Sequence, residues 1–177
     1  MRSLCLIFFL AGSLSAAGEL VGRRAPGFSL PDRTFQYHDP QDYRGKILLV
    51  EFMQTSCPHC AVFSKILQEV STKYAGKVSV LSIVNPPDTP QNVGNYATAH
   101  KITTPILFDC GQIAASYIAW APGKAPGFDL PRLFIIDAGG NIRRDLEYNV
   151  LNKEIFEGRG LFVELDKMLS DQRGVKK

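Results

Sequence analysis

The sequence predicts an α/β fold with a mainly parallel central sheet, on three observations. Apolar runs of strand length alternate along the chain with amphipathic stretches of helical period. The two most apolar runs, residues 47–53 and 77–84, indicate strands buried on both faces, as parallel strands usually are. A glycine-containing turn at 138–141 joins two further runs and predicts an antiparallel hairpin at one edge. We therefore expect helices on both faces of the sheet.

Length and composition favour one domain. The chain has 177 residues, 45% of them hydrophobic, which is enough for one core and too little for two comfortable ones. The formal net charge is only +3, and the basic residues are not clustered along the domain. Nothing in the composition therefore indicates a nucleic-acid partner.

Residues 1–17 predict a signal peptide, which leaves 18–177 as the domain. Arg2 provides a positive charge, residues 4–14 are apolar, and small residues at 15–17 precede Gly18. The apolar core is short for a membrane span, so we expect cleavage and a periplasmic or secreted protein without stable membrane insertion. Cys5 would leave with the leader. An uncleaved leader that tethers the protein to a membrane is the alternative.

The remaining elements follow from local pattern and punctuation. Residues 25–32 mix apolar and turn residues and predict a short edge strand or hairpin. Residues 61–74 have apolar positions at helical spacing and predict a helix after the first buried strand. Gly158 and Gly160 weaken the first half of the last helix. Further along, the pattern predicts a helix at 90–100 capped by Thr89, a strand at 106–108, a helix at 111–118, a loop at 121–127, strands at 132–137 and 142–148, and a helix at 153–169.

The chemically informative motif is Cys57-Pro58-His59-Cys60, between the first buried strand and its helix. This placement puts Cys57 at a helix N-terminus, where unpaired N–H groups and the helix dipole stabilise a thiolate. Pro58 suits the first helical turn because it lacks an N–H, and His59 can further stabilise the thiolate. The carboxyl ends of the strands, where the motif lies, are the usual place for sites in such sheets.

A Cys-x-x-Cys pair can be a redox dithiol, half of a zinc site or an inert buried pair. A structural zinc site needs a second pair of ligands, whereas His38, His100 and Cys110 are isolated in the sequence. We therefore predict a redox dithiol with no metal and no cofactor. Cys110 has two interpretations, a second reactive thiol or, more usually, a small buried apolar residue.

The chain resembles the thioredoxin superfamily and, within it, the secreted TlpA/ResA-like, AhpC/TSA-related thiol-disulfide oxidoreductases. The similarity covers residues 25–169, and the segment between the helix after the dithiol and Pro131 resembles the extra strand and helix of TlpA-like and peroxiredoxin-like members. The motifs that carry it are Ala-Pro-Gly-Phe-Ser-Leu at 25–30, Tyr-Arg-Gly-Lys at 43–46, Glu51-Phe52 ahead of the dithiol, Leu-Pro-Arg-Leu-Phe-Ile-Ile-Asp at 130–137 and Gly-Asn-Ile at 140–142.

The resemblance implies roles for three further residues. Pro131 falls at the family's cis-proline, and Leu130 before it would line a groove in which an extended substrate pairs with the backbone. Trp120 and Phe128 are candidates to extend that groove or to pack inward as loop anchors. An ordinary proline at a strand start is the alternative for Pro131. Glu51 falls where thioredoxins keep a buried acid that relays a proton to Cys60, and the alternative is an outward-facing side chain.

The predicted activity is thiol-disulfide exchange with protein substrates, in which Cys57 attacks and Cys60 resolves the mixed disulfide. The expected partners are protein dithiols or disulfides and a redox partner protein. TlpA/ResA-like reductases commonly have proline at the position of His59, whereas the Pro-His pair resembles the oxidising DsbA-type enzymes. The direction of electron transfer stays open.

Two alternative functions belong to related folds. A peroxiredoxin-like peroxidase normally has threonine or serine three residues before its reactive cysteine and a proline further upstream, whereas this chain has Gln54 and Val50. A Sco-type copper chaperone uses Cys-x-x-x-Cys with a distant histidine. The spacing here is one residue short, although His100 is available as a third ligand.

Overall fold

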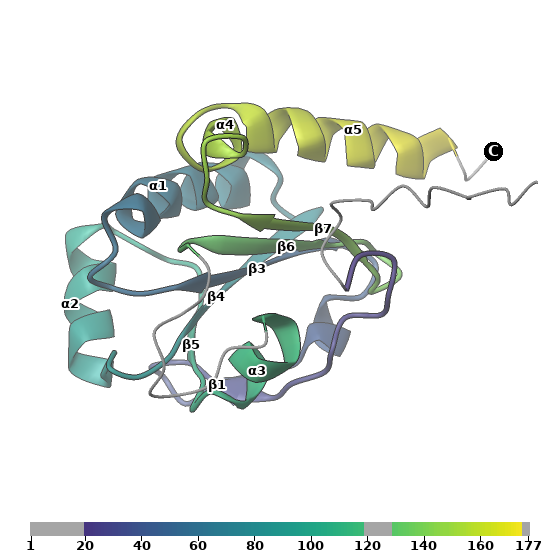
Figure 1. The fold of residues 1–177 in the computed structure, drawn as a ribbon. Helices are drawn as coiled ribbons and strands as arrows, with labels where there is room; N and C mark the ends of the chain where they lie inside the picture. Colours follow the sequence, from purple (N-terminus) through teal and green to yellow (C-terminus); the bar gives the residue numbers. More distant parts are fainter. Residues whose placement is uncertain (1–19, 119–128, 175–177) are drawn as a thin grey trace, which may run out of the picture.

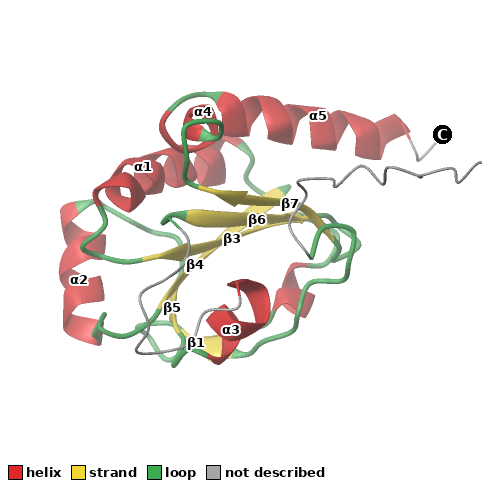
Figure 2. Ribbon diagram, in the orientation of Figure 1, coloured by secondary structure: helices red, strands yellow, loops and turns green. Residues whose placement is uncertain are grey.

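The computed structural model describes residues 20–118 and 129–174, which form a five-stranded sheet with helices on both faces and a small two-stranded hairpin (Figures 1 and 2). The strands are β1 (Leu30–Pro31), β2 (Tyr37–His38), β3 (Ile47–Met53), β4 (Val78–Val84), β5 (Ile106–Phe108), β6 (Arg132–Ile136) and β7 (Ile142–Glu147). The helices are the 3-10 turn η1 (Pro40–Tyr43), α1 (Pro58–Lys73), α2 (Pro90–Ala99), α3 (Gln112–Ile118), α4 (Lys153–Glu157) and α5 (Gly160–Gly174). The predicted α/β class is confirmed.

The main sheet has the strand order β5-β4-β3-β6-β7, and it contains both parallel and antiparallel pairs. Strands β3, β4 and β5 are parallel, whereas β6 pairs antiparallel with β3 and β7 antiparallel with β6. The expectation of a mainly parallel sheet is therefore only half right. The short turn between β6 and β7 makes them an antiparallel hairpin, and its inner strand β6 is the one that runs opposite to β3, whereas β7 has the same direction as β3. Between α1 and Pro131 the described chain forms β4, α2, β5 and α3.

The central strand β3 is buried along its whole length and contributes side chains to an apolar cluster on each face of the sheet. Its alternating side chains point to opposite faces. Ile47 and Leu49 pack under α1, α4 and α5 with Phe63, Leu67 and Phe156. A second apolar cluster, on the opposite face, contains Leu48, Val50 and Phe52 with Ala114 and Tyr117 of α3 and Phe28 of the N-terminal segment. Glu51, by the same alternation, points to the α1 face.

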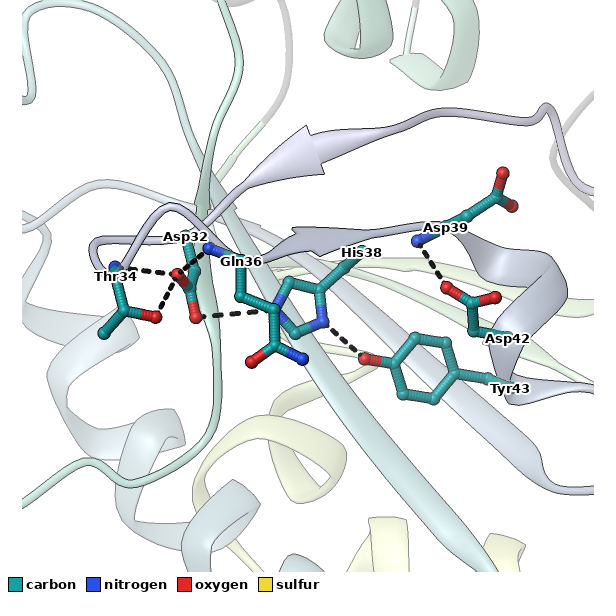
Figure 3. A network of polar contacts seen from close by, with 7 residues as sticks. All are labelled: Asp32, Thr34, Gln36, His38, Asp39, Asp42 and Tyr43. Carbon is teal, nitrogen blue, oxygen red and sulfur yellow. Dashed lines mark hydrogen bonds and ion pairs between the residues drawn. The ribbon is translucent and has the colours of Figure 1, made fainter.

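A polar network closes the N-terminal hairpin of β1 and β2, as Figure 3 shows. Asp32 accepts hydrogen bonds from Thr34 N and Oγ1, both at 2.7 Å, and from Gln36 N at 3.1 Å. The buried His38 ring lies between Asp32 Oδ2, 3.4 Å from Nε2, and the Tyr43 hydroxyl, 2.6 Å from Nδ1. Asp32 also bridges to Leu107 of β5, so the network attaches the hairpin to the edge of the main sheet.

The predicted last helix is two helices, α4 and α5, which corrects the single helix expected at 153–169. Gly158 ends α4 with ψ of −145°, far from helical values. A Cβ at Gly158 would lie 2.2 Å from Glu154 Oε2, and one at Gly160 would lie 2.9 Å from the Glu154 backbone. The two glycines thus allow a tight corner, and Glu157 becomes the last residue of a short helix.

Three sequence-based expectations lie outside the described residues: the leader at 1–17, the loop at 121–127, and the placement of Trp120 and Phe128. Within residues 20–118 and 129–174, no helix has the length and apolar character needed to cross a membrane.

Candidate active site

A strand, a tight turn and a helix place Cys57 at the carboxyl end of β3. The Cys57 N–H closes the turn on the Gln54 carbonyl oxygen at 3.1 Å. The turn is fixed from the neighbouring loop, since Thr55 N donates to Asp88 Oδ2 at 2.9 Å. Cys57 is the N-cap of α1, and Pro58 is the first helical residue, as the sequence predicted.

Cys57 is half-buried and its sulfur takes the place of a capping oxygen. Its Sγ accepts a hydrogen bond from Cys60 N at 3.1 Å. A hydrogen bond from the Cys60 thiol, backbone N–H groups of Cys60 and His59, and the charge of His59 together outweigh burial and lower the pKa of Cys57 to about 6. The Cys57 sulfur is therefore largely a thiolate at neutral pH.

Cys60 has the opposite environment three residues later. It is fully buried, among Met53, Val84 and residues of α2. Burial, the hydrogen bond to Cys57 and the charge of Glu51 raise the pKa of Cys60 well above its ordinary value. Both thiols are free in this structure. The pair thus combines an accessible, ionised sulfur with a shielded, protonated one.

Glu51 lies on the same face of β3 as Met53 and is completely buried. Its Oε2 accepts a hydrogen bond from Ser82 Oγ of β4 at 2.6 Å, whereas its Oε1 has no hydrogen-bond partner among the described residues. Burial, opposed by the Ser82 hydrogen bond and assisted by the charge of Cys57, raises the pKa of Glu51 to about 8. An acid with this pKa exchanges its proton near neutral pH.

The Leu130–Pro131 segment faces the dithiol from the start of β6. Its peptide bond is cis, and the Leu130 carbonyl oxygen lies 3.7 Å from Cys57 Sγ. Leu130 is half-buried and packs against the cluster that contains Cys60, whereas Pro131 is buried. The Pro131 carbonyl oxygen accepts a hydrogen bond from Tyr148 N at 3.0 Å, which extends the pairing of β6 with β7 up to the site.

His59 points to the outer side of the site, toward two residues that sequence reasoning missed. Its ring stacks on Tyr148 with centroids 4.0 Å apart, and its Nδ1 lies 3.0 Å from Glu157 Oε1. The hairpin pairing could have located Tyr148, because Arg132 pairs with Glu147 and residue 148 therefore comes beside Pro131. No local signal indicates Glu157, which is 98 residues away from His59 in the chain.

His100 and Cys110 are the other residues that are isolated in the sequence. His100 follows α2 and packs on Tyr96, with ring centroids 4.5 Å apart. No group of three or more His, Cys, Asp or Glu within the described ranges could hold a metal ion. Cys110 is exposed, so the expectation of a buried apolar residue is wrong. The chain turns Asp109 inward instead, where its carboxylate accepts from Ala114 N at 2.9 Å and from Asn85 Nδ2 at 2.8 Å.

Comparisons with known proteins agree with this geometry. The profile of the AhpC/TSA family matches residues 21–145, which is most of the chain. The chain belongs to the AhpC/TSA family. It has the thioredoxin-like fold and resembles ResA proteins, as the sequence motifs predicted.

Individual relatives of this family member share about a quarter of its residues. It is 27% identical to the thioredoxin-like protein YneN of Bacillus subtilis over 82% of this chain and 81% of that protein. It is 29% identical to the thiol-disulfide oxidoreductase ResA of Geobacillus thermodenitrificans over 76% of this chain and 74% of that protein. A crystal structure of a thiol:disulfide interchange protein of the thioredoxin family from Chlorobium tepidum matches with a TM-score of 0.59 and 24% identity. The match covers 70% of this chain and 83% of that chain. The solved structure supports the fold.

Proposed function

We propose that this protein is an extracytoplasmic enzyme that exchanges disulfides with protein substrates through Cys57 and Cys60. The class of activity, thiol-disulfide oxidoreductase, follows from the family, the curated relatives and the free dithiol. The observation that carries the proposal is the contrast between the two sulfurs. One is half-exposed with its pKa lowered to about 6, and its partner is buried with its pKa raised.

Each step of exchange then has a group in place. The Cys57 thiolate attacks a substrate disulfide, its sulfur bonds to one substrate sulfur, and the other leaves as a thiolate. Cys60 must lose its proton to attack the mixed disulfide at Cys57, which forms the protein disulfide and releases the reduced substrate. Glu51, buried on the same side of the sheet, is the acid-base group that can take that proton. The reverse sequence oxidises a substrate dithiol.

We assign substrate positioning to Leu130 and Pro131. The Leu130 carbonyl oxygen lies beside Cys57 Sγ, so an extended substrate segment can pair with this backbone while its cysteine meets the sulfur. Pro58 and His59 are assigned to tuning the Cys57 thiolate, since Pro58 opens the helix and the charge of His59 lowers the Cys57 pKa. The substrates are protein disulfides or dithiols, with a redox partner protein to restore the starting state.

The extracytoplasmic assignment depends on the predicted leader at residues 1–17, with 18–177 as the mature domain. An oxidising compartment is where such a dithiol turns over against substrate disulfides. N-terminal sequencing of the protein from the producing cell should find Gly18 first. Recovery of an intact N-terminus in the membrane fraction would support the tethered alternative.

Single cysteine variants test the assignment, with insulin as the disulfide substrate and dithiothreitol as the electron donor. The Cys57→Ser variant should lose catalysis by about a thousandfold or more, because the nucleophile is gone. The Cys60→Ser variant should accumulate a mixed disulfide at Cys57, since resolution fails. Cys110→Ser is the matched control and should keep full activity. Loss of activity in Cys110→Ser with retention in Cys57→Ser would reverse the assignment.

The same variants separate the rival functions. Consumption of hydrogen peroxide by Cys60→Ser at a rate comparable to thiol exchange would favour a peroxidase. Stoichiometric retention of Cu(I) by the wild-type protein after chelation, without exchange activity, would favour a copper chaperone. The reduction potential of the dithiol decides direction, with a value near DsbA indicating an oxidant and one near thioredoxin a reductase.

A further inference from the structure

The outer side of the dithiol holds a cluster of three side chains from distant parts of the chain: His59 of α1, Tyr148 after β7 and Glu157 of α4. The imidazole of His59 stacks on the Tyr148 ring at 4.0 Å with 22° between the planes. The Tyr148 hydroxyl donates to Glu157 Oε1 at 2.6 Å, and His59 Nδ1 lies 3.0 Å from that same oxygen. Glu157 Oε1 thus accepts a hydrogen bond from the Tyr148 hydroxyl and lies within hydrogen-bond distance of the His59 ring.

The two partners of His59 are held by the fold. The Tyr148 N–H is bonded to the Pro131 carbonyl oxygen, so its ring is fixed beside the substrate-facing segment. Tyr148 also packs edge-on against the buried Phe156, with ring centroids 5.9 Å apart. Glu157 ends α4, and Lys153 one turn earlier lies 3.5 Å from its Oε2. Contacts with Lys153 and Tyr148 therefore orient the Glu157 carboxylate independently of His59.

This arrangement constrains the orientation of the imidazole. A carboxylate acceptor at Nδ1 requires a proton on that nitrogen and holds the ring in one place. The charge of His59 lowers the pKa of Cys57, so the position of the ring decides how strongly it favours the thiolate. Stabilising the thiolate stabilises the reduced dithiol relative to the disulfide and makes the protein a stronger oxidant.

We propose that Glu157 and Tyr148 are positioning residues that hold the His59 imidazole in the place from which its charge acts on Cys57, and that they thereby set the reduction potential of the dithiol. The inference rests on the proposed role of Cys57 as the reactive sulfur. The titratable groups that face His59 are Glu157, Tyr148 and Cys57, and Lys153 faces Glu157 from the opposite side.

The electrostatics of the individual groups agree with this assignment. Hydrogen bonds from Tyr148 and His59 lower the pKa of Glu157, so it is a carboxylate throughout the neutral range. The bond to Glu157 raises the pKa of Tyr148 to about 12, which keeps its hydroxyl a donor. The His59 side chain remains 46% exposed and that of Glu157 23%, so this pair contributes little to folding. Its effect should appear in the redox properties instead.

The test is the Glu157→Gln variant of the full chain, with Glu154→Gln as the matched control on the same short helix. The thiolate absorbance of Cys57 is titrated, and the equilibrium with glutathione is measured at pH 7. In Glu157→Gln we expect the pKa of Cys57 to rise by about half a unit to one unit. The oxidised form of the protein should then gain roughly threefold to fivefold against glutathione. Glu154→Gln should change neither quantity.

The Tyr148→Phe variant, which keeps the ring but loses the hydroxyl, should give a smaller change in the same direction.

A His59→Ala background separates positioning from direct electrostatics. There Glu157→Gln should leave the pKa of Cys57 and the glutathione equilibrium unchanged, because the group that it positions is absent. An unchanged potential in Glu157→Gln, or an equal shift in the His59→Ala background, would overturn the inference. Failure of the proposed function is distinguishable, since it would appear in the wild-type protein as a missing low-pKa thiolate and missing insulin reduction.

Discussion

Glu51 and Asp32 are two carboxylates of the same domain, one near the dithiol and the other in the N-terminal hairpin, and their surroundings differ in burial and in the number of hydrogen-bond donors. Asp32 receives two backbone N–H groups, a hydroxyl and the His38 ring (Figure 3). Glu51 receives one hydroxyl and is completely buried. Burial opposes ionisation of Asp32, but its hydrogen bonds prevail and lower its pKa, whereas burial prevails at Glu51 and raises its pKa to about 8.

The difference shows how one sheet can hold a structural and a reactive acid. A carboxylate with several donors remains ionised over the neutral range and ties its hairpin together. A buried acid with one donor exchanges its proton near neutral pH, and the stability of the fold decreases when it ionises. Glu51 lies near Cys60, where such an acid is useful, whereas Asp32 lies in a hairpin that attaches to the far edge of the sheet.

The largest expected effect is that of Glu51→Gln on the pH dependence of stability. In the wild type the folded-state pKa of Glu51 is raised from 4.5 to about 8, so folding favours the protonated acid. Its contribution is therefore present below the unfolded-state pKa and is lost as the pH rises toward 8. Relative to Glu51→Gln, the wild type should lose on the order of 3–5 kcal/mol of unfolding free energy between pH 4.5 and 8.

Urea unfolding followed by circular dichroism, on the reduced proteins at a series of pH values, measures this difference. Cys57 also titrates in this range, but its contribution is shared by both proteins and largely cancels in the comparison. The same variant should slow resolution of the mixed disulfide by about a hundredfold, since an amide takes no proton. A stability difference independent of pH would mean that Glu51 is not the acid described above.

Asp32→Asn should have a smaller and oppositely shaped effect. Because the pKa of Asp32 is lowered in the fold, its contribution is fully present above the unfolded value of 3.8 and is lost as the pH falls through the folded value. We expect a loss of about 1–2 kcal/mol in unfolding free energy at pH 7, constant between pH 5 and 8. Insulin reduction should be unchanged. A slope like that of Glu51 across the neutral range would remove the distinction between the two acids.

The parts of the fold that sequence predicted are those with local causes. Short stretches of neighbouring residues were enough to predict the apolar strand β3, the proline at the start of α1 and the Thr89 cap of α2. The structure has all three where expected. The placement of Cys57 at a helix N-terminus follows from the same local order of strand, turn and helix. The burial of Glu51 could be anticipated because an acid in the middle of an apolar strand has few other places to go.

The parts that sequence reasoning missed depend on contacts across the chain. The direction of β6 and β7 relative to β3 is a property of the assembled sheet, and the exposure of Cys110 depends on Asp109 turning inward. Gly158 and Gly160 indicated a weak helix but not that the chain turns a corner there. Nothing local links Glu157 to His59, so the outer side of the site becomes visible only when α4 packs on α1.

Ser82→Ala is the finest test of the comparison, because it changes the one hydrogen-bond donor that Glu51 has among the described residues. The Ser82 hydroxyl bonds to the carboxylate and lowers the pKa of Glu51 against burial. Its removal should raise that pKa further, by about one unit, which corresponds to about 1.4 kcal/mol. Carbon NMR titration of the Glu51 carboxyl measures the midpoint directly. Ser79→Ala is the control, since Ser79 lies on the same strand β4 but alternation directs it to the other face. A midpoint that falls in Ser82→Ala would mean that Ser82 accepts a hydrogen bond from the protonated acid, and donor number would then no longer explain why Glu51 and Asp32 differ.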